Sequence, residues 1–388
     1  MPPLSLYVHF PWCVAKCPYC DFNSHALRGE LPAEQYLAAL QQDLRSWPAE
    51  FRERPLQSVF LGGGTPSLFA PDVLARLLEL IARVCSLPAD AEITLEANPG
   101  ALEHGAFAGY VAAGINRLSL GVQSFDDDRL QALGRIHSSA DALRAFAAAR
   151  AAGIDNINLD LMYALPDQPV DGAVADIERA LSLAPEHISH YHLTLEPNTV
   201  FYSRPPALPS ADLAWSMQAA CAQRLSAAGF LNYEVSAWAQ PERACRHNLN
   251  YWRYGDYMAI GAGAHAKVTA RDGQVFRSAR AAHPREYQRR VAAGVAAGDL
   301  QLVATADRPF EFMLNALRLR DGVPLAAYAA YTGLAIESLE PGLSAALQAG
   351  LLDPLSSGRL RASDRGWRFL DDLQVLFLPS AAAAAGGP

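Results

Sequence analysis

The chain has 388 residues, 51% of them hydrophobic and 19% charged, a balance that suits a globular protein with one large core and a smaller domain. Its formal net charge of −8 argues against an extended interface for DNA or RNA, so no nucleic acid is expected as a main partner. The first ten residues lack the charged region of a signal peptide, and no apolar run reaches the roughly 20 residues that span a bilayer, which predicts a cytoplasmic location.

Short apolar runs that predict β-strands alternate with alanine- and leucine-rich segments of helical period through the first 200 residues. The expected strands are residues 6–10, 58–61, 92–96, 117–122, 157–162 and 188–195, and the expected helices include 33–44, 71–84, 140–151 and 172–183. Such alternation implies an α/β fold with a parallel sheet, either a partial TIM-type (β/α)6 barrel or a doubly wound sheet. Glycine and polar residues gather after the strands, which favours an open barrel over residues 1–200 with its site at the carboxyl ends.

The pattern changes after residue 200. Residues 201–304 indicate a mixed α/β extension, which begins with a proline-rich connector and includes a helix at 211–228. Residues 305–378 indicate a small, mainly helical, winged-helix-like C-terminal domain with helices at 309–319, 325–332 and 338–350. The final stretch, 379–388, is a low-complexity alanine and glycine sequence and predicts a disordered tail.

Three of the six cysteines, Cys13, Cys17 and Cys20, follow the first strand in a C-x-x-x-C-x-x-C arrangement. A reducing compartment would keep the thiols free, and Pro18 prevents the loop at 13–20 from continuing as a regular helix, so the three can surround a compact metal centre. One candidate is structural zinc with His25 as the fourth ligand. The other is a 4Fe-4S cluster, in which three cysteines leave one iron open to a small molecule.

This cysteine signature, with an aromatic residue at Tyr19, resembles the radical S-adenosylmethionine (SAM) superfamily. The resemblance implies a 4Fe-4S cluster on Cys13, Cys17 and Cys20, with SAM chelating the open iron. The GGGTPS segment lacks the Lys-Ser/Thr pair of a phosphate-binding P-loop. Its residues Gly63, Gly64 and Thr65 match the superfamily segment that contacts the methionine part of SAM.

A closer resemblance extends over nearly the whole chain. The segments YVHFPWC, GGGTPS, EANPG, GVQSF, LGRIH, NLDLMYALP and HLTLEPNT are similar, in order, to the pattern of the oxygen-independent coproporphyrinogen III oxidase-like family. The resemblance implies that Tyr7 and Tyr19 flank SAM. It also implies that four polar residues bind the polar groups of SAM, namely Glu96, Gln123, Arg135 and Asp160. These residue types suit that task, because Arg135 offers a fork of donors for a carboxylate and the others can accept from hydroxyls or an ammonium.

Two features separate the oxidases of this family from its other members. The oxidases carry a further cysteine two residues after the third, and this chain has Phe22 there, which puts decarboxylation in doubt. The HNLNYW segment resembles the H-N-x-x-Y-W motif of the HemW heme chaperones, and CDFNSHA is also similar to them. The resemblance implies heme contacts by His247, Tyr251 and Trp252, which offer an imidazole beside two large rings. Cys245 or His265 could replace His247 as the iron ligand.

The leading hypothesis is therefore a heme chaperone that contains a SAM-liganded 4Fe-4S cluster and transfers heme to acceptor proteins, for which the family suggests respiratory heme proteins. It is a binding function more than an enzymatic one, and whether SAM is cleaved stays open. The sequence also leaves open whether the protein contacts a membrane through an acceptor and whether it forms a homodimer. Two alternatives are a radical SAM enzyme acting on coproporphyrinogen III and a zinc-stapled interaction protein.

Overall fold

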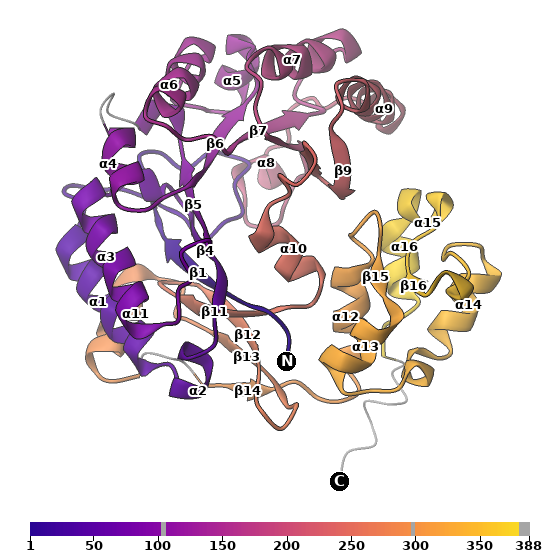
Figure 1. Ribbon diagram of the computed structural model, residues 1–388. Coiled ribbons are helices and arrows are strands. Elements are labelled where there is room, and N and C mark those ends of the chain that lie inside the picture. The colour runs from indigo at the N-terminus through magenta and orange to yellow at the C-terminus, as the bar shows by residue number, and fades with distance from the viewer. Residues whose placement is uncertain (102–105, 296–298, 380–388) are drawn as a thin grey trace.

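A computed structural model describes residues 1–101, 106–295 and 299–379 of the chain (Figure 1). The predicted tail lies, from residue 380 onward, outside the described residues. Within the described ranges no helix combines the length and the apolar character that crossing a membrane requires.

The six predicted parallel strands are confirmed. They are β1 (Leu4–Phe10), β4 (Leu56–Gly63), β5 (Glu92–Ala97), β6 (Arg117–Gln123), β7 (Ile157–Tyr163) and β8 (His187–His192). Each pairs in parallel with the next along the sheet, in chain order. Alternate residues of each strand therefore point to the same face, and all the carboxyl ends lie at one edge.

Helices between the strands cover the outer face of the curved sheet (Figure 1). They are α1 (Ala33–Ser46), α3 (Pro71–Val84), α4 (Ala106–Ala112), α6 (Ser139–Ala151) and α7 (Val170–Ser182), with α9 (Ala211–Ala227) packed beside α7 and α11 (Pro284–Ala292) beside α1. Local sequence explains their ends. Pro71 occupies the first turn of α3, where a missing N–H costs nothing, and Ser138 and Asp141 form a reciprocal capping box at α6.

The 201–304 region adds strands to both ends of this sheet. Strand β11 (Asp256–Ile260) pairs in parallel with β1, followed by the antiparallel strands β12 (His265–Thr269), β13 (Val275–Ala279) and β14 (Gln301–Leu302). At the other end β10 (Ala237–Ala239) pairs with β8, and β9 (Leu231–Glu234) is the last strand. The resulting 12-stranded sheet is bounded by β14 and β9, so the barrel is open. Helix α10 (Arg246–Trp252) lies on its concave side (Figure 1).

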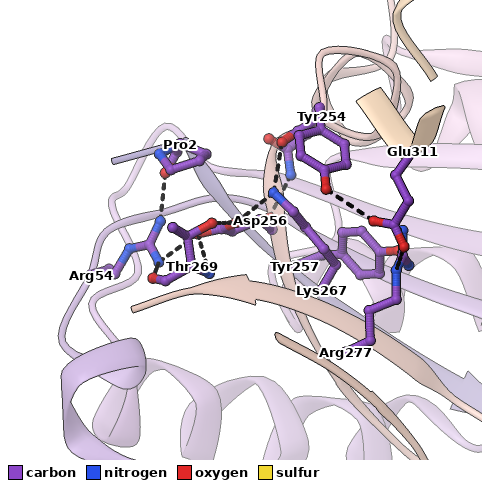
Figure 2. A network of polar contacts seen from close by, with 10 residues as sticks. Pro2, Arg54, Tyr254, Asp256, Tyr257, Lys267, Thr269, Arg277 and Glu311 are labelled. Carbon is purple, nitrogen blue, oxygen red and sulfur yellow. Dashed lines mark hydrogen bonds and ion pairs between the residues drawn. The ribbon is translucent and has the colours of Figure 1, made fainter. Parts of the chain in front are cut away.

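A buried polar network fastens β11 to its surroundings (Figure 2). The Asp256 carboxylate is 2.8 Å from Arg54 Nη1 and 3.0 Å from Lys267 Nζ, and it accepts hydrogen bonds from the amide and hydroxyl groups of Thr269. Beside it, Glu311 accepts hydrogen bonds from Tyr254 and Arg277. Because Glu311 belongs to α12 (Arg308–Ala316), the network reaches from the sheet to the C-terminal helices.

The C-terminal helices surround a second hydrophobic core. Besides α12 they are α13 (Leu325–Thr332), α14 (Gly342–Gln348), α15 (Asp364–Arg368) and α16 (Leu370–Val375), accompanied by the two-stranded ladder of β15 (Val323–Pro324) and β16 (Arg359–Leu360). The helix predicted at 338–350 is wrong at its start. A 3-10 turn at Ile336–Leu339 ends first and α14 begins after Pro341, because proline lacks the N–H that a continuing helix needs.

Candidate functional site

A cavity of about 480 Å³ lies at the carboxyl ends of the parallel strands. Most of the residues predicted to bind the cluster and SAM line it: Cys13, Cys17, Tyr19, Cys20, Gly63, Gly64, Thr65, Glu96, Gln123, Arg135 and Asp160. Of the predicted heme residues, Trp252 also lines the cavity. Residues more than 200 positions apart in the sequence therefore meet at one place, as expected for the carboxyl edge of a parallel sheet.

The three cysteines lie on a loop beside this cavity. All three are free and half-buried, and the short parallel pair β2 (Trp12–Cys13) and β3 (His25–Ala26) closes the base of the loop. The Cys20 Sγ lies 3.6 Å from the Ser24 hydroxyl oxygen, and Arg135 Nη1 lies 3.5 Å from the Cys17 Sγ. Burial raises the pKa of the Cys13 and Cys20 thiols. The positively charged guanidinium beside Cys17 would stabilise an anionic group bound by this loop.

The GGGTP segment holds the cysteine loop in place. The N–H groups of Gly64 and Thr65 donate to the carbonyl oxygens of Phe10 and Trp12, each at 2.7 Å. A Cβ at Gly64 would lie 2.6 Å from the Trp12 oxygen, so only glycine permits this approach. The glycines therefore serve two purposes, because they bring the loop against the sheet and also leave bare backbone on the cavity wall.

Two buried carboxyl groups face the cavity. Glu96 accepts a hydrogen bond from Gly63 N–H at 2.9 Å, and burial raises its pKa to about 8. Burial also raises the pKa of Asp160, whose oxygens accept hydrogen bonds from Ser119 and Asn158 at 2.9 and 2.8 Å. Gln123 stands at a bulge with a positive φ of 69° and accepts a hydrogen bond from the Tyr191 hydroxyl. These groups present oxygen acceptors to a cationic or hydroxyl-bearing ligand.

The two tyrosines predicted to flank SAM lie in different places. Tyr19 lines the cavity, and its ring is tilted against that of Phe201. Tyr7 does not appear on the cavity wall. Its hydroxyl hydrogen-bonds to the Nδ1 of His9 at 2.9 Å, and its ring stacks on Phe60 beneath the cavity floor.

Helix α10, which carries HNLNYW, fills the concave side of the sheet, but it does not bring all three predicted heme residues to the cavity. Asn248 and Trp252 line the cavity, whereas His247 packs against the rings of Phe60 and Tyr251 with centroid distances of 4.7 and 4.8 Å. Burial lowers the pKa of His247 to about 3, so its imidazole is neutral at physiological pH. Its Nδ1 has no hydrogen-bond partner among the described residues.

The alternative iron ligands have different surroundings. Cys245 is buried at the start of α10, where burial raises the pKa of its thiol to about 12, which disfavours a thiolate. The glycine-rich segment before His265 packs against the Asn23 side chain. A Cβ at Gly263 would lie 2.2 Å from Nδ2 of Asn23, and Asn23 donates hydrogen bonds to the carbonyl oxygens of Ala262 and Ala282. Asn23 therefore makes the close approach that this glycine-rich segment permits.

Sequence reasoning missed the residues that position α10. The Glu92 carboxylate accepts hydrogen bonds from the N–H groups of Arg246 and His247, and Arg117 lies 4.0 Å from it in the barrel interior. At the cavity mouth the Arg318 guanidinium lies over the Trp252 ring, 4.3 Å from its centroid. The available signal was the charged residue that begins each of the strands β5 and β6.

The donor set fits an iron–sulfur cluster with SAM better than it fits zinc. No three histidine, cysteine or carboxylate side chains in the described ranges gather closely enough to hold a single metal ion. A zinc site needs its donors around one ion, whereas a cluster distributes three thiolates over three iron corners. His25, the proposed fourth zinc ligand, lines a separate cavity that contains none of the three cysteines.

Comparison with known proteins identifies the family. Residues 7–180 match the model of the radical SAM superfamily, and residues 303–369 match that of the HemN C-terminal domain. The heme chaperone HemW of Escherichia coli strain K12 is 46% identical over 378 residues, which cover 97% of this chain and 99% of that protein. The chain belongs to the HemW family.

Other comparisons agree with membership of the HemW family. The heme chaperone HemW of Haemophilus influenzae is 45% identical over 97% of this chain and 98% of that protein, and that of Bacillus subtilis is 35% identical over 87% and 89%. The solved structure of coproporphyrinogen III oxidase (HemN) from E. coli, a radical SAM enzyme, matches with a TM-score of 0.81 over 97% of this chain and 90% of that one. At 22% identity that match shows a shared fold.

Replacing Glu96 by glutamine should stabilise the cluster-free HemW-family fold at pH 8 while weakening SAM binding. The folded pKa of about 8 exceeds the ordinary value of 4.5, so the folded protein binds the Glu96 proton more tightly than the unfolded chain. The stability that Glu96 contributes is therefore complete below pH 4.5 and is lost as the pH rises to 8. Glutamine keeps an oxygen acceptor for the Gly63 N–H and does not ionise, so the variant does not lose this stability as the pH rises. We expect a gain of about 2–4 kcal/mol at pH 8.

Denaturant unfolding of the parent and Glu96→Gln at pH 5 and pH 8 measures this difference. Isothermal titration with SAM after cluster reconstitution tests the predicted role of Glu96 as a SAM ligand, for which binding should be about tenfold weaker in the variant. Glu337→Gln, an exposed glutamate in the C-terminal region, is the control. A variant that is less stable than the parent at pH 8 would show that the fold does not raise the pKa of Glu96.

Proposed function

We propose that this chain is a heme chaperone that binds SAM at a 4Fe-4S cluster, binds heme transiently, and transfers it to acceptor proteins. The observation that carries the proposal is the identity of 46% over nearly the full length to a protein named heme chaperone HemW. The HNLNYW helix, held by Glu92 against the cluster cavity, supports it.

Different residues of the 480 Å³ cavity would bind the cluster and SAM. Cys13, Cys17 and Cys20 would ligate three irons, and the remaining iron supplies a coordination position for SAM. Arg135, fixed by a 2.7 Å hydrogen bond to the Gly121 carbonyl oxygen, would bind the carboxylate of SAM. Glu96, Gln123 and Asp160 would accept hydrogen bonds from its ammonium and ribose hydroxyl groups. Tyr19 would cover the ligand from the loop side.

Heme would enter at the part of the cavity where α10 meets the C-terminal helices. Trp252 offers an aromatic face there, and Arg318 above it offers a cation for a propionate carboxylate. His247 would supply a neutral imidazole as the iron ligand. Its ring would have to leave the contact with Phe60 and Tyr251, so we propose that α10 shifts when heme binds.

An anaerobic heme titration of the cluster-reconstituted protein tests this function. The parent should show saturable binding in the Soret band, and His247→Ala should weaken one binding component at least tenfold and change its spectrum, because the iron loses its imidazole. His190→Ala is the matched control, since His190 is equally buried, has a similarly lowered pKa, and stacks on Tyr163 away from α10.

Equal titration curves for the parent, His247→Ala and His190→Ala would contradict heme ligation at HNLNYW. Loss of carboxyl groups from coproporphyrinogen III in an anaerobic assay with SAM would instead favour the oxidase reading. Phe22, which is 59% exposed on the cavity wall and cannot ligate iron, speaks against that reading.

We propose the cytoplasm as the location and heme proteins, including respiratory ones, as the acceptors. Contact with a membrane would then occur through the acceptor. Size-exclusion chromatography of the reconstituted protein with and without SAM would test for a homodimer.

A further inference from the structure

A second cavity lies on the other side of the cysteine loop. It has a volume of about 740 Å³, and Ser24 lines both cavities. Its wall comes from the residues that follow the third cysteine and from the start of α11, and it includes His25 and His283. We call it the His25–His283 cavity. Its volume lies within the range of small-molecule binding sites.

The charge of this cavity is opposite to that of the whole chain. Lys16, Arg28 and Arg285 line it, against a single carboxylate, Glu30. No other described residue forms an ion pair or a hydrogen bond with the side chains of Arg28 and Arg285, and Lys16 donates only to the Phe22 carbonyl oxygen. In a chain with a net charge of −8, three such cations around one cavity indicate an anionic ligand.

The two histidines add a potential metal ligand. Their rings stand edge to face with centroids 5.5 Å apart, and Nε2 of His25 is buried with no hydrogen-bond partner among the described residues. Burial and the nearby His283 lower the pKa of His25, and a hydrogen bond with the Ala282 backbone opposes that shift. His283 is already engaged, because its Nδ1 accepts a hydrogen bond from the Arg285 N–H. His25 is therefore the imidazole with unused bonding capacity.

The remaining wall is apolar and includes Trp12, Leu27 and Pro284. A free phosphate or an acidic peptide would use the cations but would need neither the imidazole nor this wall. Heme uses all three, because it is a flat apolar ring with two carboxylates and an iron that binds imidazole. We propose that the His25–His283 cavity is a second heme-binding site, in which His25 ligates the iron and Lys16, Arg28 and Arg285 bind the propionates.

This inference rests on the proposed function, since it takes heme as the cargo. It gives a role to the CDFNSHA segment, whose His25 neither the cluster nor SAM uses. His25 is also only half-buried, whereas His247 is buried in the ligand-free chain, so a turn of the His25 ring would present its Nε2 for initial heme capture. Two sites on opposite sides of the cysteine loop would allow heme to be taken up at one and held at the other.

Anaerobic hemin titration of the cluster-reconstituted full chain tests the second site. We expect two saturable components in the parent, and His25→Ala should remove the component that His247→Ala leaves in place. His190→Ala, a histidine of β8 outside this cavity, is the control. The double variant Arg28→Glu, Arg285→Glu changes only exposed side chains, so folding is preserved, and it should weaken the same component at least tenfold.

The outcomes separate this inference from the proposed function. If His247→Ala alone abolishes all saturable binding, the cavity is no heme site and the heme chaperone proposal stands. If His25→Ala and the charge-reversal variant both titrate like His190→Ala, the second site is likewise overturned. If the parent shows no saturable heme binding, both proposals fail.

Discussion

Replacing Asp256 by asparagine should lower the free energy of unfolding by about 3–5 kcal/mol, because it leaves two buried cations without their counter-charge. The Arg54 and Lys267 side chains are 10% and 1% exposed, and Asp256 is fully buried between them (Figure 2). Burial already lowers the pKa of Lys267, the Asp256 carboxylate opposes that shift, and the arginine stays charged. For a chain of this length the melting temperature should fall by about 4–6 °C.

Thermal unfolding followed by circular dichroism measures this effect, with Asp321→Asn as the control at an exposed position. A double variant that adds Lys267→Met should lose less stability than the sum of the two single changes, since it removes one of the stranded cations. The network joins β11 to its neighbours, so we expect the lost stability to lower the unfolding free energy of the whole sheet. A shift within 1 °C, as roughly expected for a surface change, would mean that Asp256 carries no net stabilising charge.

Replacing Cys17 by alanine should abolish the cluster. Iron after anaerobic reconstitution should fall from about four atoms per chain to nearly none, because two thiolates cannot retain a cluster that already lacks a fourth cysteine ligand. SAM binding should disappear with it, since the open iron is its main anchor. The ligand-free fold should persist, because the β2 and β3 pair closes the loop through backbone hydrogen bonds.

Cys85→Ala is the matched control, as Cys85 is buried against α3 and far from the cavity lining. Iron and sulfide analysis together with the visible absorbance of the cluster gives the readout. Full iron retention in Cys17→Ala would show that the cluster ligands are assigned wrongly. Zinc without iron in the parent would instead support the zinc-stapled alternative.

The order of strands and helices followed directly from the sequence, because the strands are short, mainly apolar runs that alternate with segments of helical period. Strands β1, β4 and β5 all lie where alternation predicted them. The helix at 338–350 was placed too early, since alanine and leucine content outweighed the effect of Pro341. Helix α5 (Asp127–Ala132) was not anticipated, because it is too short to show a full helical period.

The site residues could also be recognised from the sequence where they belong to one short motif. Cys13, Cys17 and Cys20 belong to one loop, and GGGTPS is one turn, so spacing alone makes them recognisable. Glu92 and Arg117 gave no such signal, because each acts through a partner more than 20 positions away. His247 was recognised by its motif, but nothing in HNLNYW indicated that its ring would lie under Phe60, away from the cavity wall.

The sequence by itself determined the α/β alternation, the cysteine loop and the family of this protein, because these depend on periodicity and on short-range spacing. Only the tertiary structure decided that β11 joins β1, that α10 fills the barrel interior, and that His25 meets His283 in a separate cavity. These contacts join segments up to about 250 residues apart. Their free energy comes from burial and ion pairing between distant side chains, which local sequence does not encode.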